Sequence, residues 1–164
     1  MSKIIAGDTA PDFALNDTNG KRVSLREALA RGPVVAVFFK ISCPTCQFTF
    51  PFLQRLFQTY GSDGATFLAI SQDDAADTRE FCEEYGVGFT ALVDDEGYPV
   101  SNDYGLTNVP TFYLIAPDGR VQVDSVGFGK KALEKIAQEL ARVQGHPAVP
   151  LFQPGEVVPD AKPG

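Results

Sequence analysis

The stretch of sequence that decides the fold is residues 34–46, which read Val34-Val35-Ala36-Val37-Phe38-Phe39-Lys40-Ile41-Ser42-Cys43-Pro44-Thr45-Cys46. Its first six residues are apolar, β-branched or aromatic, which is typical of a strand buried on both faces. A short polar break and a Cys-Pro-Thr-Cys motif follow. After the second cysteine, phenylalanine and leucine recur at helical spacing as far as Tyr60. The two cysteines are therefore expected at the point where a central strand gives way to a helix.

This position predicts a chemical role for Cys43 and Cys46. The first turn of a helix carries unpaired N–H groups and partial positive charge, and both favour a nucleophilic thiolate at Cys43. Cys46 follows one turn later and can close a disulfide with it. Pro44 fits because the first helical turn needs no backbone donor. We interpret the motif as a redox pair; inert thiols and half of a zinc site are the alternatives, and for zinc only Cys82 and His146 remain as further ligands.

The composition describes one soluble globular domain and excludes several classes of partner. The chain has 164 residues, is 44% hydrophobic and 21% charged, and carries a formal charge of −7 without any basic cluster. A nucleic-acid or anionic-membrane partner is therefore not expected. No stretch approaches the roughly 18 apolar residues that a membrane helix needs. No metal or other cofactor is expected, and the oligomeric state stays open.

The compartment is expected to be the cytoplasm. The first residues lack an apolar run long enough for a secretory signal, because Gly7 and Asp8 end it early. Three cysteines are also too few for the disulfide framework of a small secreted fold. An exported chain whose leader had been removed would look the same.

The remaining segments read as alternating strands and helices. A hairpin with a turn at Asn19-Gly20 is expected within 8–24, and Ser24 can cap the helix that follows. The expected helices are 25–30, 44–60 with Pro51 in its interior, 75–85, 100–104 and 130–143. The expected strands are 34–39, 65–70, 90–93, and a hairpin of 108–116 with 120–126.

The character of the sequence changes after Gly145. Five of the twelve prolines fall between Pro147 and Pro163. We therefore divide the chain into a domain over 1–145 and a Pro-rich extended tail over 146–164 that has no core of its own. The tail residues that could dock on the domain are Val149, Leu151, Phe152 and Val157.

Three separated motifs resemble the thioredoxin fold. They are the Cys-Pro-Thr-Cys motif after a buried strand, Pro51 five residues beyond its second cysteine, and Val109-Pro110-Thr111 at the start of a later hairpin. The segment 7–13 and the hairpin after it are similar to the redoxin branch, which holds alkyl hydroperoxide reductase/thiol-specific antioxidant proteins and thiol–disulfide oxidoreductases of the cytochrome-maturation type. The resemblance covers about residues 5–143. It implies an α/β fold, with a central mixed sheet flanked by helices and an added N-terminal hairpin.

The resemblance also implies roles for individual residues. Cys43 would be the attacking thiol and Cys46 the resolving thiol, in a thiol–disulfide oxidoreductase with a part in antioxidant activity and cell redox homeostasis. Pro110 would be a cis-proline facing the cysteines, and Val109 would offer backbone to a substrate chain. The predicted substrate-binding residues are Pro44, Thr45, Val109 and Pro110. The implied partners are a disulfide-containing protein or a small-molecule thiol, together with an external dithiol donor; whether the pair oxidises or reduces stays open.

Two positions depart from the thioredoxin pattern. Val37 stands where thioredoxins carry a buried Asp, so the usual proton acceptor for the second cysteine is absent, and Ser42 stands where they carry a Trp. Lys40 is a candidate for tuning the thiols by its charge, although a lysine after a buried strand is more often simply solvated. The substrate groove is therefore expected to differ from that of a general thioredoxin.

Two other functions remain as alternatives. A peroxiredoxin-like peroxidase would use Cys46 as its peroxidatic cysteine, but Cys43 replaces the Thr of that pattern and no Arg accompanies 108–110. Cys82 could resolve in that scheme, although its place beside Phe81 favours a buried structural thiol. A non-catalytic binding protein or a copper-handling protein on the same fold is the second alternative. Copper-delivery relatives carry a Cys-x-x-x-Cys pair and a distant His, so the spacing here is one residue short, and His146 is expected to be an ordinary surface residue.

Polar residues elsewhere have simpler explanations. The run Ser71-Gln72-Asp73-Asp74 follows a buried strand, at an edge of the sheet where functional sites often lie, and capping of the next helix explains Asp73 and Asp74 equally well. The run 94–96 is expected to be a solvated acidic turn, since it lacks the alternating oxygen ligands of a calcium site.

Overall fold

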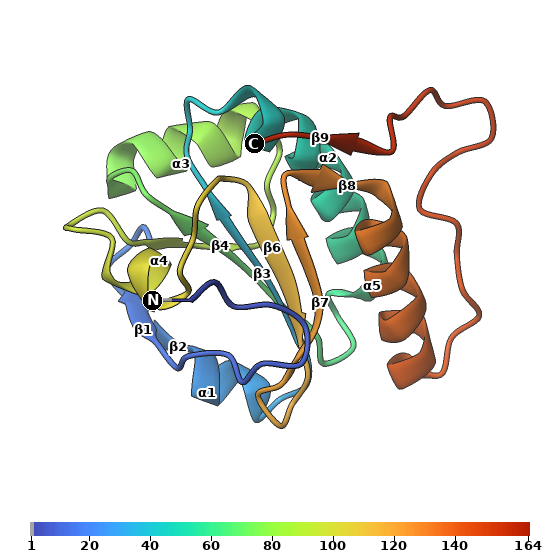
Figure 1. Ribbon diagram of the computed structural model, residues 1–164, viewed down its shortest axis with the longest axis horizontal. Coiled ribbons are helices and arrows are strands. Elements are labelled where there is room, and N and C mark those ends of the chain that lie inside the picture. Colours follow the sequence, from blue (N-terminus) through green and yellow to red (C-terminus); the bar gives the residue numbers. More distant parts are fainter. Residues whose placement is uncertain (1) are drawn as a thin grey trace.

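Five strands form a central mixed sheet in the order β5-β4-β3-β6-β7 in the computed structural model, which describes residues 2–164 (Figure 1). Strands β3, β4 and β5 are parallel, whereas β6 runs antiparallel to both β3 and β7. This is the predicted mixed sheet. The strands are β3 (Val34–Phe39), β4 (Thr66–Ser71), β5 (Thr90–Val93), β6 (Thr111–Ile115) and β7 (Val121–Val126).

Helices and the predicted N-terminal hairpin cover the two faces of this sheet. On one face lie α2 (Pro44–Tyr60), α3 (Ala75–Glu84) and α5 (Lys130–Gln144). On the other lie the hairpin of β1 (Ala14–Asn16) and β2 (Arg22–Ser24), with α1 (Leu25–Leu29) and α4 (Pro99–Asp103). The helix boundaries agree with the sequence-based expectation to within one residue at each end.

Strand β3 separates the two halves of the core. Alternate residues of a strand point to opposite faces, so β3 contributes to both hydrophobic clusters, and all six of its residues are buried. Val35, Val37 and Phe39 belong to the cluster under α2 and α5, and Val34, Ala36 and Phe38 belong to the cluster under the hairpin and α4. The apolar run is continuous in sequence because helices or hairpin cover both faces of this strand.

The acidic turn at 94–96 differs from its expectation. Asp94 is 2% exposed, so it is not a solvated residue. Its carboxylate accepts hydrogen bonds from the backbone N–H groups of Val100 and Ser101, at 3.2 and 2.9 Å, and from the Ser101 hydroxyl at 2.8 Å. Asp94 thus holds the first turn of α4, whose preceding residue, Tyr98, offers no side-chain cap.

The Pro-rich tail returns along the outside of the domain. Figure 1 shows it leaving the end of α5, passing outside that helix and finishing near the start of α2. Its short strand β9 (Ala161–Lys162) pairs antiparallel with β8 (Phe128–Gly129). Leu151 and Phe152 pack against the core as expected, whereas Val149 and Val157 are 53% and 97% exposed. The expectation was wrong for Val157, which faces solvent, whereas Val149 is half-exposed and lies beside Ala137 of α5.

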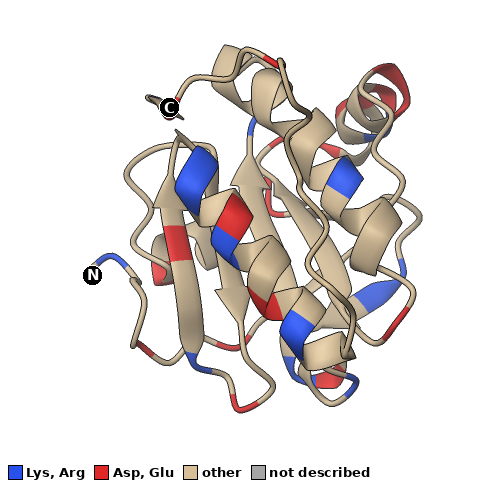
Figure 2. Cartoon of the chain, turned by 90° about the vertical axis from the view of Figure 1, so that its right-hand side faces the viewer, with Lys and Arg blue, Asp and Glu red and all other residues tan. Residues whose placement is uncertain are grey.

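Charge is distributed without a dominant patch on the face drawn in Figure 2, where basic and acidic residues are interspersed along α5. Among residues 2–164, none of the helices has the length and apolar character needed to cross a membrane.

Candidate active site

The two cysteines of the motif occupy unequal environments at the junction of β3 and α2. Cys43 is the N-cap residue of α2, with an extended backbone, and Pro44 opens the helix. The Cys43 sulfur accepts a hydrogen bond from the backbone N–H of Cys46 at 3.1 Å. Both are free thiols in this structure. The helix start therefore places an orphan backbone donor on the sulfur of the first cysteine, as expected for an attacking thiol.

Cys46 is completely buried, whereas Cys43 is only half-buried. Burial, followed by a side-chain hydrogen bond with Cys43, raises the pKa of Cys46 above its ordinary value of 9.0. Cys46 therefore stays a neutral thiol in the reduced pair. Cys43 lines an open pocket of about 450 Å³, whose other walls are Lys40, Pro44, Gln72, Leu106, Thr107, Asn108, Val109 and Gly164. Of the two sulfurs, Cys43 is the one that a disulfide from solution can reach.

The loop before β6 faces the cysteine pair. The Val109–Pro110 peptide bond is cis, as the resemblance implied. The Cys43 thiol donates to the carbonyl oxygen of Val109, with the sulfur and oxygen 3.5 Å apart. The structure thus brings together Cys43, Cys46 and the two predicted binding residues of this loop.

An aspartate holds the other side of the site. The Asp73 carboxylate follows β4 and accepts a hydrogen bond from the backbone N–H of Ile41 at 2.8 Å. The side chain of Gln47 donates to the Ile41 carbonyl at 2.9 Å. Of the two explanations that the sequence left open for this pair of aspartates, capping of α3 holds only for Asp74, which accepts from the N–H of Asp77. Asp73 instead fixes the loop that leads into Cys43.

Comparison with known proteins identifies the type of site. Residues 6–124 match the AhpC/TSA family. The chain belongs to this family. Among its relatives, the thiol-disulfide oxidoreductase ResA of Bacillus subtilis (strain 168) is 32% identical over 119 residues, which are 72% of this chain and 65% of that protein, just under two thirds of its length. ResA of Halalkalibacterium halodurans is 30% identical over 81% of this chain and 76% of its own.

A solved structure supports the same assignment. A putative thiol:disulfide interchange protein DsbE from Chlorobium tepidum superposes with a TM-score of 0.75 and 29% identity, over 88% of this chain and all of the other. The expectation of a thioredoxin-like fold in the redoxin branch is thus confirmed. With an accessible thiol and a buried one at a helix start, the site is a thiol–disulfide oxidoreductase centre.

The residues that a peroxidase or a copper-handling protein would need are either buried or far from the cysteine pair. A peroxidatic cysteine must meet peroxide, but Cys46 is buried and neutral. His146 pairs with Asp63 at 2.8 Å, beyond the far end of α2, and a helix of that length holds it ~25 Å from the cysteines. Within residues 2–164, no cluster of His, Cys, Asp and Glu has the arrangement of a metal site. Cys82 packs at the edge of the core, and its burial raises its pKa to about 11.

The tail adds residues to the site that sequence reasoning did not place there. The Thr45 hydroxyl donates a hydrogen bond to the Pro163 carbonyl at 2.6 Å. Gly164 lines the pocket that contains Cys43. Lys40 lines the same pocket with an exposed side chain, whose ammonium lies 5.8 Å from the centre of the Tyr98 ring rather than on either sulfur.

Proposed function

We propose that this protein exchanges disulfides with a substrate in two steps at the carboxyl end of β3, where α2 begins. The Cys43 thiolate attacks a substrate disulfide, forms a mixed disulfide through its own sulfur and releases one substrate thiolate. Cys46 then loses its proton and attacks the Cys43 sulfur, which releases the second substrate thiolate and leaves a Cys43–Cys46 disulfide. Two electrons and two protons pass from the pair to the substrate, and an external dithiol returns them.

The observation that supports this order of events is the unequal exposure of the two sulfurs. A half-buried Cys43 at the helix start can meet a substrate, whereas a fully buried Cys46 can meet only Cys43. The raised pKa of Cys46 supports the same order, because a neutral Cys46 does not compete with Cys43 for the first attack. It must then give up its proton when the mixed disulfide has formed.

The predicted binding residues have a place in this scheme. Val109 offers a backbone carbonyl beside Cys43, and Thr45 offers a hydroxyl from the first turn of α2. Both could hold the extended backbone next to a substrate cysteine. Pro44 is exposed beside Cys43 and forms part of the pocket wall.

Trapping the mixed disulfide tests the mechanism. Cys46→Ser should accumulate a covalent adduct with a disulfide-containing probe protein such as native insulin, visible by mass spectrometry and released by dithiothreitol. Cys43→Ser should give none, and Cys82→Ser should behave as the wild type. An adduct that forms on Cys46 in Cys43→Ser as fast as on Cys43 in Cys46→Ser would contradict the assigned order.

The cellular setting is part of the proposal. We place the reaction in the cytoplasm, where a dithiol donor keeps such a pair reduced and the protein contributes to antioxidant defence and redox homeostasis. The small number of cysteines, three in 164 residues, supports a compartment in which structural disulfides are rare. Cell fractionation with an antibody against the chain tests this; recovery in an exported fraction would contradict it.

A further inference from the structure

The tail segment 160–164 lies in the groove beside Cys43. Strand β9 pairs with the free edge of β8, and the Lys130 N–H donates to the Asp160 carbonyl at 3.0 Å. Further along, the Thr45 hydroxyl holds the Pro163 carbonyl at 2.6 Å. The tail backbone thus follows a strand edge into the first turn of the helix that carries both cysteines.

Glycines on both sides permit this close approach. Gly127 has a φ of +78°, and a Cβ on it would clash with the Lys162 carbonyl oxygen. A Cβ on Gly164 would clash with the carbonyl oxygen of Val109, which is also the acceptor for the Cys43 thiol. The backbone of Gly164 therefore packs directly on the residue that is expected to receive a substrate chain.

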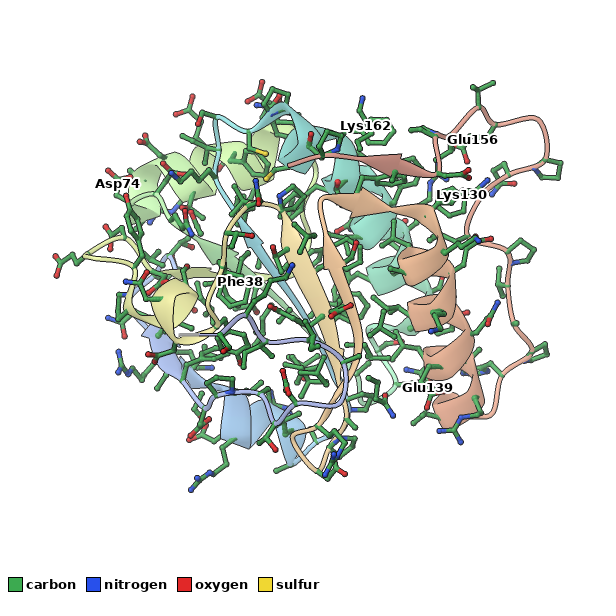
Figure 3. All side chains as sticks on the ribbon, in the orientation of Figure 1. Phe38, Asp74, Lys130, Glu139, Glu156 and Lys162 are labelled. Carbon is green, nitrogen blue, oxygen red and sulfur yellow. The ribbon has the colours of Figure 1, made fainter. Side chains whose placement is uncertain are left out.

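Side chains before and within the segment hold it in place. The Arg55 guanidinium makes two hydrogen bonds to the Glu156 carboxylate, at 2.8 and 2.6 Å. The Lys162 ammonium lies 4.6 Å from the centre of the Phe48 ring on α2, and the Lys130 ammonium 5.3 Å from the Phe152 ring. Figure 3 shows Lys130, Glu156 and Lys162 at the same end of the molecule, where the tail meets β8.

The contacts of this segment are those that an extended polypeptide makes. Apart from the Lys162 ammonium over the Phe48 ring, they are made by the segment's backbone, which pairs with β8 and accepts a hydrogen bond from the Thr45 hydroxyl, and residues 161–164 remain exposed. Any extended chain with a small residue next to Val109 could make the same backbone contacts. The surface formed by β8, Thr45 and Val109 therefore fits a peptide strand, and a protein substrate would need it.

We propose that residues 160–164 are a built-in competitor of protein substrates, bound in the groove that receives the extended chain beside a substrate disulfide. This rests on the proposed function, because it concerns the same Cys43. A protein disulfide reacts only in molecules whose segment 160–164 has left the groove. A small disulfide reaches Cys43 through the open pocket of about 450 Å³ while the segment stays bound.

The segment lowers the rate with protein substrates because only the fraction of molecules whose segment 160–164 has left the groove can bind them. The apparent affinity for a protein substrate falls in proportion to that fraction, so removing the segment should restore the intrinsic affinity. The chemical step is unchanged: Cys43 forms the mixed disulfide, one substrate thiolate leaves, and Cys46 completes the exchange.

The test compares the reduction of insulin and of oxidised glutathione by the full chain and by a shortened chain. A chain ending at Val158 keeps the Arg55–Glu156 pair and the packing of Leu151 and Phe152, so the domain keeps its support. With dithiothreitol as donor, this shortened chain should reduce insulin severalfold faster than the full chain, mainly through a lower KM. Reduction of oxidised glutathione should change less than about twofold, since the pocket is open in both chains.

A point variant and a peptide complete the test. Gly164→Ala, which places a Cβ against Val109, should raise the insulin rate, whereas Val157→Ala, which shortens a side chain of the same tail that is 97% exposed, should not. A synthetic peptide of residues 156–164 should slow insulin reduction by the shortened chain and leave glutathione reduction unchanged.

The outcomes separate this proposal from the proposed function. Equal insulin rates for the full and shortened chains, or a parallel rise with both disulfides, would overturn the competitor while leaving the exchange mechanism in place. A slower insulin rate in the shortened chain would overturn it too, because the segment would then assist binding. Absence of any exchange by either chain would contradict the proposed function itself.

Discussion

The backbone N–H of Cys46 points at the sulfur of Cys43, 3.1 Å away, while the side chain of Cys46 is sealed in the core. Cys46 thus stabilises the attacking sulfur through its backbone N–H, and its own buried thiol is placed to attack that sulfur in the second step. The helix start provides the N–H, because the first turn of α2 has no carbonyl partner for it. The different roles of the two cysteines, Cys43 as the attacking thiol and Cys46 as the resolving thiol, therefore follow from their positions in the first turn of α2.

The unequal exposure predicts unequal alkylation. In reduced Cys82→Ser protein under native conditions, iodoacetamide should modify Cys43 at least tenfold faster than Cys46, because Cys46 is reached only when the structure opens. Mass spectrometry of the digested protein measures both sites. In denaturant the two cysteines should react at similar rates, which serves as the control. Comparable rates in the native protein would contradict the proposed order of attack.

The contact between Asp73 and Ile41 predicts a residue that positions the active-site loop. Asp73→Ala should leave the Ile41 N–H without its acceptor, lower stability by about 1–2 kcal/mol and change the alkylation rate of Cys43. Asp73→Asn keeps an acceptor oxygen and should recover most of the native rate. Asp74→Ala is the matched control: it removes a helix cap, costs about 1 kcal/mol and should leave the Cys43 rate unchanged. Identical Cys43 rates in all three variants would argue against a positioning role.

The half-buried position of Cys82 at the edge of the core predicts a loss of stability at alkaline pH. Its pKa is raised from 9.0 to about 11, chiefly by burial and secondarily by the charge of Glu83. The folded protein therefore holds this proton more tightly than the unfolded chain. The resulting stabilisation is complete below pH 9 and is lost as the pH rises from 9 to 11, by about 1–2 kcal/mol.

Urea unfolding of the reduced protein between pH 8 and 11 measures this effect. Stability should fall less steeply with pH in Cys82→Ala than in the wild type, whatever offset the lost packing introduces. The buried Tyr104 and Tyr113, whose pKa values are raised, contribute equally to both curves. Parallel curves over this range would contradict the assignment.

The ion pair between Arg55 and Glu156, which anchors the tail, predicts that the tail leaves the domain in acid. The hydrogen bonds from Arg55 lower the pKa of Glu156 from 4.5 to about 2. The ionised carboxylate therefore favours the docked tail above pH 4.5, and this contribution disappears as the pH falls towards 2. Glu156→Gln should release the tail to a similar extent at neutral pH.

The Lys130 amide reports on docking, because it donates to the Asp160 carbonyl at the unpaired start of α5. Its hydrogen exchange, followed by NMR, should accelerate in Glu156→Gln. In Glu139→Gln, which removes another surface ion pair with Arg142, exchange at Lys130 should match the wild type. If Glu156→Gln leaves Lys130 as protected as before, the ion pair does not hold the tail.

The sequence was sufficient to predict the parts of the site that lie on one local pattern. The apolar run 34–39 and the Cys-Pro-Thr-Cys motif after it define a buried strand followed by a helix, and the structure has both with the same boundaries. The place of Val109-Pro110 came from the resemblance, since nothing near it in sequence marks it as facing Cys43.

The sequence could not predict the contacts that the site makes between segments far apart in the chain. Asp73 reaches Ile41 because β3 and β4 are parallel neighbours whose carboxyl ends meet at one edge. Two polar stretches following adjacent parallel strands are a usable signal for such a pair. The docking of 160–164 carries no apolar signal at all, because it depends on backbone pairing and on glycines that only the folded structure brings face to face.

The reduction potential of the cysteine pair is the most direct measurement of the central claim. Cys82→Ser protein, equilibrated in glutathione or dithiothreitol buffers, should show one two-electron transition with a slope of about 30 mV per tenfold change in ratio. That transition should be lost in Cys46→Ser, and its midpoint will show whether the protein reduces or oxidises its partners. Absence of a two-electron transition, together with rapid oxidation of Cys46 by hydrogen peroxide, would contradict a dithiol mechanism and favour a peroxidase.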